Sequence, residues 1–112
     1  VSWFGFLITL KDDLPFKKSK LISHLENAKI QTRSYFTGNA LFHPAYQDLA
    51  KKYKNPRTKF PVATKSTVDT FFMGVWPGMT DEQLDYVEEV VNRFCEKEIT
   101  TLKRSKRLKR KN

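Results

Sequence analysis

The stretch that decides the fold is residues 71–98, which read FFMGVWPGMTDEQLDYVEEVVNRFCEKE. It opens with a short apolar segment, Phe71 to Val75, that ends at a Trp-Pro-Gly turn, which is the pattern of a β-strand. Thr80 then precedes Gln83 at the spacing of a capping box, which marks a helix N-terminus. Acidic residues in the first turn suit the helix dipole. We therefore predict a strand and then a helix over about residues 81–98.

Apolar residues of this helix recur at helical spacing, so one of its faces is expected to enter the core. They are Leu84, Val87, Val91 and Phe94. The same two patterns alternate upstream. Strands are expected over residues 3–10 and 30–36, a helix over 16–29, a turn at 37–39, a short helix after Pro44, a surface loop at 51–60 and one or two helical turns at 62–69. This order predicts an α+β fold, with a small antiparallel or mixed sheet of about three strands and helices packed on one face.

The length of 112 residues fits one compact domain. Hydrophobic residues make up 39% of the chain and nine are Phe, which excludes a disordered protein. A single Cys excludes an internal disulfide framework and a Cys-based zinc site, and favours a reducing compartment such as the cytoplasm. No apolar run reaches the ~18 residues of a membrane span, and residues 1–10 do not have the pattern of a signal peptide.

The formal net charge of +9 is concentrated at one end of the chain. Residues 99–112 hold seven basic residues and no acidic one, whereas residues 1–98 hold fourteen basic and twelve acidic residues. We therefore expect a domain over residues 1–98 and a disordered basic tail over residues 99–112. Because the chain begins with Val rather than Met, we also expect it to start within a longer reading frame.

No local group of residues completes a catalytic site or a metal site. His24 and His43 have no carboxylate partner that the sequence identifies, so each is interpreted as a partly exposed polar side chain. Cys95 adjoins the apolar stripe and is interpreted as a buried, inert thiol. The four glycines are dispersed and form no phosphate-binding motif.

Residues 32–39, which read TRSYFTGN, are the candidate binding segment. The guanidinium of Arg33 suits a phosphate or a carboxylate, and Asn39 suits a ligand amide or hydroxyl. Tyr35 and Phe36 suit the walls of a pocket. The alternative is an ordinary exposed Arg on a strand, followed by a turn Asn in the left-handed conformation. The spacing alone leaves both interpretations open.

The basic tail also has two interpretations. It suits weak binding to nucleic acid or to an anionic membrane surface. It contains no aromatic residue for base stacking and few apolar ones, so the alternative is a solvated tail with incidental affinity for polyanions.

Three motifs in this order carry a resemblance to a known family: SWFGF at residues 2–6, TR at 32–33 together with FTGN at 36–39, and TFFMGVWPGMT at 70–80. The chain resembles the C-terminal part of the CDP-4-keto-6-deoxy-D-glucose 3-dehydrases. These are sugar aminotransferase-like, fold type I vitamin B6 enzymes. The resemblance covers about residues 1–98 and leaves the basic tail outside.

The resemblance implies a small domain that caps the active-site cleft of a larger enzyme. Such enzymes use pyridoxamine 5'-phosphate and a reductase partner to remove the C3 hydroxyl of a CDP-linked 4-keto sugar, in the biosynthesis of the 3,6-dideoxyhexoses of lipopolysaccharide O-antigens. The cofactor carries the electronic chemistry. Most of the cofactor site, the catalytic histidine and any iron–sulfur cluster ligands belong to the absent large domain. The parent enzyme is expected to be a homodimer.

Site residues carry over only where the motifs match. Arg33 is expected to contact an anion or the sugar nucleotide, and Asn39 to make a polar contact. The other expected residues shape the loop at the cleft or lie near the domain junction: Phe36, Thr37, Gly38, Trp3 and Phe4.

The isolated chain is expected to hold no cofactor and to be inactive, because half of the cleft is missing from it. Two alternatives stay open. One is the small domain of a related nucleotide-sugar aminotransferase, which has a lysine where the dehydrases have the histidine. The other is a non-enzymatic module that binds polyanions through the tail.

Overall fold

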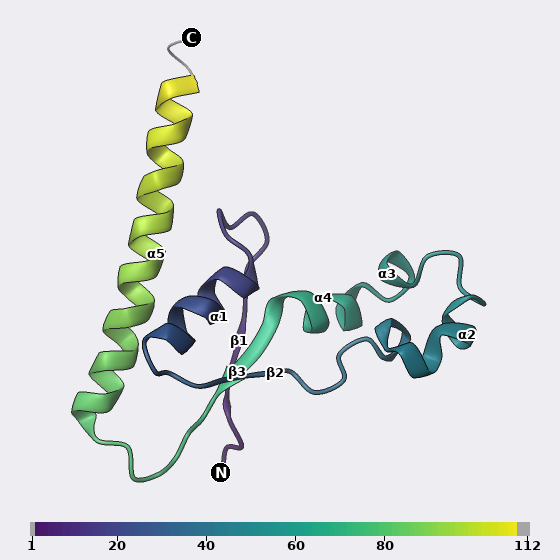
Figure 1. Ribbon diagram of the computed structural model, residues 1–112, viewed down its shortest axis with the longest axis horizontal. Coiled ribbons are helices and arrows are strands. Elements are labelled where there is room, and N and C mark those ends of the chain that lie inside the picture. The colour runs from purple at the N-terminus through teal and green to yellow at the C-terminus, as the bar shows by residue number, and fades with distance from the viewer. Residues whose placement is uncertain (1, 110–112) are drawn as a thin grey trace.

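The computed structural model describes residues 2–109, with side chains described to residue 107 (Figure 1). Its single sheet has three strands, β1 (Phe6–Thr9), β2 (Thr32–Ser34) and β3 (Thr70–Met73). β3 lies in the middle and runs antiparallel to both edge strands. The predicted α+β fold is confirmed, and of the two predicted kinds of sheet the antiparallel one is present.

Helices connect and flank the strands. The α-helices are α1 (Lys18–Asn27), α2 (Gln47–Ala50), α3 (Pro56–Lys59), α4 (Pro61–Asp69) and α5 (Asp81–Lys109), and the 3₁₀ turns are η1 (Ala40–Phe42) and η2 (Pro44–Tyr46). α1 lies between the sheet and α5, whereas η1 to α4 form an arm on the other side of the strands (Figure 1). None of the helices in the described part combines the length and the hydropathy needed to cross a bilayer.

The predicted strands over residues 3–10 and 71–75 are shortened to Phe6–Thr9 and Thr70–Met73. Two further elements, α1 and β2, end earlier than predicted because left-handed residues follow them. α1 stops before Lys29, whose φ is 63°, and β2 stops before Phe36, whose φ is 34°. A side chain at positive φ is strained, so it interrupts both regular structures. The start of α5 is as predicted, since Thr80 and Gln83 exchange capping hydrogen bonds of 3.1 and 3.3 Å.

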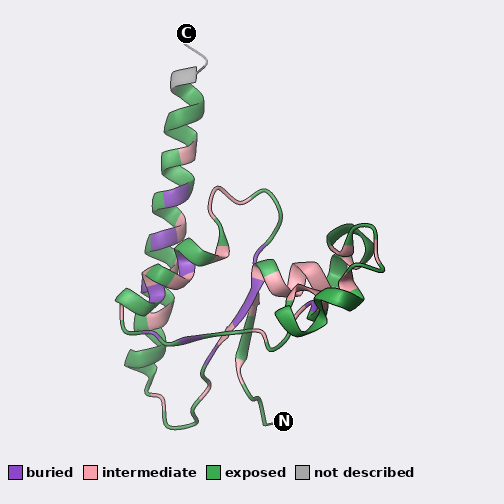
Figure 2. Cartoon of the chain, turned by 45° about the vertical axis from the view of Figure 1, so that its right-hand side comes forward, coloured by how far each residue is buried: buried purple, intermediate pink, exposed green. Residues whose placement is uncertain are grey.

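The core lies on one face of the sheet, beneath α1 and α5 (Figure 2). Residues directly opposite each other in an antiparallel pair point to the same face. Phe71 pairs with Ile8 and Ser34, so this row faces the helices. The buried apolar residues are Leu10, Leu21, Leu25, Ile30, Phe71, Met73, Val90 and Phe94.

The alignment of α1 with α5 decides which part of α5 is buried. At one end Lys20 Nζ pairs with Glu98 Oε2 at 2.6 Å, and at the other the Tyr86 hydroxyl donates to the Ala28 carbonyl at 3.0 Å. The two helices are therefore antiparallel. The prediction that Leu84 joins the buried stripe is wrong, because Leu84 lies beyond the end of α1 and is exposed. Val90 takes part in the core instead.

Two helical segments differ from the predictions. α5 does not end near Glu98 but continues to Lys109, because neither Gly nor Pro interrupts it. Helical residues thus reach into the tail that was expected to be disordered, and residues 110–112 lie outside the described part. The predicted surface loop at 51–60 contains α3, where the Asn55 side chain accepts from the Arg57 N–H at 3.2 Å and Pro56 occupies the first turn.

The second face of the sheet is not covered by α1 or α5. The row on this face consists of Leu7, Phe72 and Arg33, which pair across β1, β3 and β2. Leu7 is exposed and Phe72 is half-buried. We call this row, together with Phe4 and Phe36, the open face.

Candidate functional site

The loop of residues 35–38 follows β2 and carries the candidate residues away from the sheet. Phe36 and Gly38 both have positive φ, 34° and 58°. Both left-handed residues lie in the loop that connects β2 to η1. A Cβ at Gly38 would overlap the Thr67 hydroxyl on α4, so the loop can lie this close to the helix only because residue 38 has no side chain.

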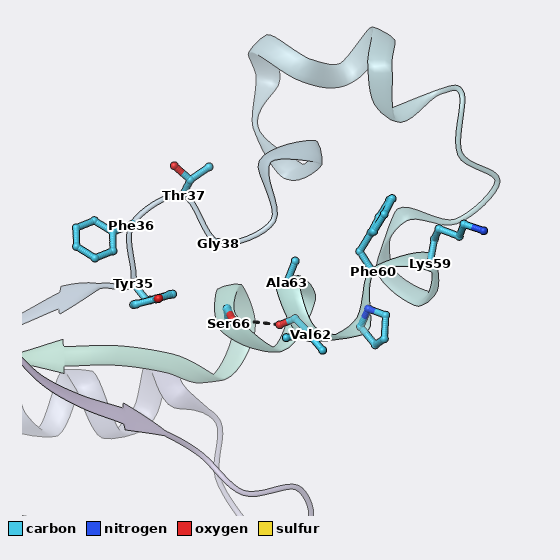
Figure 3. A pocket seen from close by; sticks show the side chains of 10 residues that line it. Tyr35, Phe36, Thr37, Gly38, Lys59, Phe60, Val62, Ala63 and Ser66 are labelled. Carbon is cyan, nitrogen blue, oxygen red and sulfur yellow. Dashed lines mark hydrogen bonds between the residues drawn. The ribbon is translucent and has the colours of Figure 1, made fainter.

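A groove separates this loop from α3 and α4 (Figure 3). Its volume is about 670 Å³, and it is open to solvent. The loop supplies one wall, and the end of α3 with the first turns of α4 supplies the other. The lining residues are Tyr35, Phe36, Thr37, Gly38, Lys59, Phe60, Pro61, Val62, Ala63 and Ser66.

The lining suits a ligand with a flat or apolar part and an anionic part. Tyr35, Phe36 and Phe60 supply aromatic surface. Lys59 is the cation among the described lining residues, and Ser66 donates its hydroxyl proton to the Val62 carbonyl at 3.1 Å. The groove therefore offers stacking and one charge but no enclosed chamber.

An aromatic cluster lies next to the groove, on the open face. The ring of Phe36 is 5.9 Å from the rings of both Phe4 and Phe72, and Phe4 is 5.5 Å from Phe72. Phe4 is 76% and Phe36 is 69% exposed, and Trp3, which precedes Phe4 in the chain, is 75% exposed. Exposed aromatic residues this close together mark an interaction surface.

Arg33 lies on the same face but does not line the groove. It stands opposite Phe72 in the sheet, and its side chain is exposed. Its guanidinium donates to the Thr32 carbonyl at 3.3 Å. With the Gln31 amide turned so that its oxygen faces the guanidinium, that oxygen accepts from both Nη atoms at 3.2 and 2.9 Å. These contacts direct the guanidinium toward residues 31 and 32 while the Arg33 side chain stays exposed.

Glu26 ties α1 to β2 close to Arg33. One carboxylate oxygen accepts from the Thr32 N–H at 2.6 Å and from the Thr32 hydroxyl at 2.7 Å. These hydrogen bonds hold the pKa of Glu26 below its usual value, and the one from the Thr32 hydroxyl has the larger effect. The nearby charge of Arg33 lowers the pKa further. The strand that carries Arg33 is therefore fixed to the core helix.

Asn39 is buried, and its polar atoms have protein partners. Its side-chain oxygen accepts from the Leu41 N–H at 3.1 Å and thereby caps η1. Its Nδ2 donates to Thr64 Oγ1 at 3.3 Å, and its backbone N–H donates to Thr67 Oγ1 at 2.6 Å. Asn39 therefore fixes the loop to α4.

The two histidines and the cysteine make packing or loop contacts and do not lie in the groove. His24 packs against Phe94 with ring centroids 5.0 Å apart. His43 Nε2 lies 2.9 Å from the Thr37 carbonyl, which closes the loop between them. Burial raises the pKa of the Cys95 thiol, so the thiol is protonated at neutral pH.

The chain by itself does not fit an enclosed site for pyridoxamine phosphate or an iron–sulfur cluster. No three His, Cys, Asp or Glu residues of the described part gather into a metal-binding group. No buried side-chain polar atom in the same part lacks a hydrogen-bond partner. The groove is open to solvent, and Lys59 is the cation among its lining residues.

Part of the groove was not identified from the sequence. Lys59 and Phe60 lie in the segment interpreted as a surface loop, and Val62 and Ser66 lie in the predicted helical turns. The pair Asn55-Pro56 and then Pro61 are helix-start signals that identify two consecutive short helices here. These helices were not predicted in full because residues 51–60 show no apolar periodicity.

Comparison with known proteins relates the chain to one enzyme family. Residues 1–92 match the DegT/DnrJ/EryC1/StrS aminotransferase family. A dTDP-4-dehydro-2,6-dideoxy-D-glucose 3-dehydratase of Saccharopolyspora spinosa is 38% identical over 96 residues, which are 86% of this chain and 20% of that protein. The lipopolysaccharide biosynthesis protein RfbH of Salmonella typhimurium is 36% identical over 93 residues, 83% of this chain and 21% of that protein. The chain thus spans about a fifth of the length of these relatives.

Proposed function

The chain belongs to the DegT/DnrJ/EryC1/StrS aminotransferase family, and on this premise we propose that it is the small, cleft-capping domain of a longer nucleotide-sugar enzyme. The resemblance inferred from its three motifs is thereby confirmed at the level of the family. The reaction that we propose for the longer protein is removal of the C3 hydroxyl of a nucleotide-linked 4-keto-6-deoxyhexose. The similarity to a 3-dehydratase supports this choice of reaction.

The observation that carries the proposal is the open face. It combines an aromatic cluster, in which Phe4 and Phe36 are exposed and Phe72 is half-buried, with the exposed side chain of Arg33, which stands opposite Phe72 in the sheet. A surface of this kind is costly to leave in water and suits a protein interface with an anionic ligand at its edge. In a protein as long as the relatives, the remaining polypeptide is available to cover it.

Each part of the site has a role in this proposal. Arg33 binds the diphosphate of the substrate, for which its two-pronged donor geometry is suited. Phe36, Thr37 and Gly38 form the edge of the cleft, and Asn39 holds that edge against α4. Trp3 and Phe4 contribute to the junction with the rest of the protein. The domain boundary after residue 98 belongs to the same proposal.

The remaining machinery is assigned to the rest of the longer protein. It would hold pyridoxamine 5'-phosphate, the proton-transferring histidine and any iron–sulfur cluster, and it would meet a reductase and a second subunit in the cytoplasm. This chain supplies orientation and exclusion of water at one wall of the cleft.

A second candidate is a nucleotide-sugar aminotransferase, and the description of the family as aminotransferases favours it. The small domain would keep the same role in that enzyme. The distinguishing residue lies outside this chain, since a lysine at the cofactor position supports transamination and a histidine supports dehydration.

The experiment is an assay of the longer protein with CDP- and dTDP-linked 4-keto-6-deoxyhexoses, pyridoxamine phosphate and a reducing system. Products are identified by mass spectrometry. Loss of the C3 hydroxyl supports the dehydrase, and an amino sugar formed from glutamate supports the aminotransferase. The isolated chain, assayed in parallel, is expected to be inactive. Turnover by the isolated chain would refute its role as a capping domain.

A further inference from the structure

The end of α5 is a separate structural feature that the proposed function does not use. Among the helix residues up to 107, whose side chains are described, the last buried one is Glu98, and the helix continues to Lys109 (Figures 1 and 2). The family match ends at residue 92. We call residues 99–107 the α5 extension; it projects from the body of the domain as a continuous rod.

The charge of α5 changes sign along its length. Residues 81–98 hold seven acidic and two basic residues. The α5 extension holds four basic residues and no acidic one, and all four side chains are exposed: Lys103, Arg104, Lys106 and Arg107. None of the four pairs with a carboxylate of the described residues.

The helix sets the spacing of these charges. At a rise of about 1.5 Å per residue, the four cations from Lys103 to Arg107 lie within about 6 Å of helix axis. Double-stranded DNA carries about one negative charge per 1.7 Å, so the same length of duplex presents about three or four phosphates. The two linear charge densities are nearly equal and opposite.

The repulsion within the extension also favours an anionic partner. Lys103 and Arg107 are neighbours at i and i+4, and Arg104 and Arg107 at i and i+3, where like charges destabilise a helix. Phosphates placed beside them remove this repulsion. Binding is therefore expected to stabilise the helix of the segment.

Other anionic partners fit the extension less well. A helix that lies on a membrane needs a broad apolar face, and the apolar residues of the extension are Ile99 and Leu102. Recognition of single strands relies on stacked aromatic residues, of which the extension has none. Contacts to backbone phosphates alone carry no sequence information.

We propose that the α5 extension binds the phosphate backbone of duplex nucleic acid without reading its sequence. The interaction is electrostatic and goes beyond the proposed nucleotide-sugar chemistry. It predicts a steep dependence on salt, because each neutralised phosphate releases condensed counterions.

The test uses fluorescence anisotropy of a short, labelled DNA duplex titrated with the full chain at several salt concentrations. The extension variant carries Lys103→Gln, Arg104→Gln, Lys106→Gln and Arg107→Gln. The matched control removes the same charge from exposed lysines of the body and carries Lys11→Gln, Lys17→Gln, Lys52→Gln and Lys54→Gln. Circular dichroism establishes that both variants remain folded.

The proposal expects the extension variant to lose at least about tenfold in affinity at ~50 mM salt, and the slope of log K against log salt to fall by about 3–4. Lys103→Gln alone should lower that slope by about one. The control should keep the wild-type slope, and duplexes of different sequence should bind equally.

Three outcomes would overturn the proposal. Equal losses in the extension variant and the control would assign the binding to overall charge. Binding to phosphatidylserine vesicles through the extension, with no duplex binding, would assign it to a membrane surface. Self-association in sedimentation that the extension variant abolishes, again with no duplex binding, would pair the basic end of one α5 with the acidic part of another.

Discussion

Gly38 and Thr67 are in direct contact, and this contact joins the candidate loop to α4. The Thr67 hydroxyl accepts the Asn39 N–H at 2.6 Å and donates to the Ala63 carbonyl at 3.0 Å. It therefore lies between the loop and the helix. A Cβ on residue 38 would occupy the position of this hydroxyl. The groove wall thus depends on a residue without a side chain.

Gly38→Ala is expected to destabilise the chain by more than about 1–2 kcal/mol. The left-handed conformation alone costs an L-residue about that much, and the overlap with Thr67 adds to it. Urea denaturation followed by circular dichroism measures the loss. The matched control is Gly74→Ala, since a Cβ at residue 74 would lie more than 4 Å from every described atom outside residues 73–75. Equal stability of the two variants would contradict the contact.

The sequence predicted the candidate site only in part, because residues that are close together in the segment 32–39 lie in different places in the structure. Arg33, Phe36 and Asn39 were expected in one site. On a strand successive side chains point to opposite faces, and two left-handed residues then turn the chain. As a result Arg33 lies on the sheet, Phe36 borders both the open face and the groove, and Asn39 is buried. Backbone conformations of this kind do not follow from hydrophobic periodicity.

The sequence predicted the fold better than the site, because the capping, turn and hydrophobic patterns of most elements match the residues that are buried. The capping box at Thr80 located the start of α5, and the apolar run from Phe71 located β3. The burial of α5 was less predictable, since it depends on where α1 ends. Leu84 has the spacing of a core residue but lies beyond the Tyr86–Ala28 contact. A sequence pattern shows which residues share a face but not how far the partner helix reaches.

Phe94→Ala is expected to cost about 3 kcal/mol or more of unfolding free energy, as is usual for a buried phenyl ring. Phe94 is 4% exposed and packs edge-on against Phe16, with ring centroids 4.9 Å apart. Chemical denaturation checks the value. Leu84→Ala serves as the control on the same helix and should change stability by less than about 0.5 kcal/mol. Similar losses for both would contradict the alignment of α1 with α5.

Glu26→Gln is expected to make the stability of the chain less sensitive to acid. The hydrogen bonds from Thr32 lower the folded pKa of Glu26 below its usual 4.5. A group with a lowered folded pKa contributes stability that is fully present above its unfolded pKa and is lost as the pH falls through the folded pKa. The loss therefore occurs below about pH 4.5. Thermal unfolding between neutral pH and pH 3 should show a smaller acid loss in the variant.

The control for this pH dependence is Glu96→Gln, which makes the same change in charge at an exposed position of α5. It should keep the acid sensitivity of the wild type. If Glu26→Gln and Glu96→Gln gave identical profiles, the hydrogen bonds to Thr32 would not be the cause.

Arg33→Ala in the longer protein is expected to weaken substrate capture more than folding. Arg33 is exposed on the open face, so its loss should leave the unfolding midpoint unchanged within about 0.5 kcal/mol. A charge-assisted hydrogen bond is worth roughly 1.5–3 kcal/mol, so KM for the nucleotide sugar should rise about tenfold to a hundredfold. Arg33→Lys keeps the charge but not the two-pronged geometry, and should give an intermediate KM. An unchanged KM in Arg33→Ala would show that the guanidinium is an ordinary surface group, and the diphosphate contact would then have to be sought at Lys59, the cation of the adjoining groove.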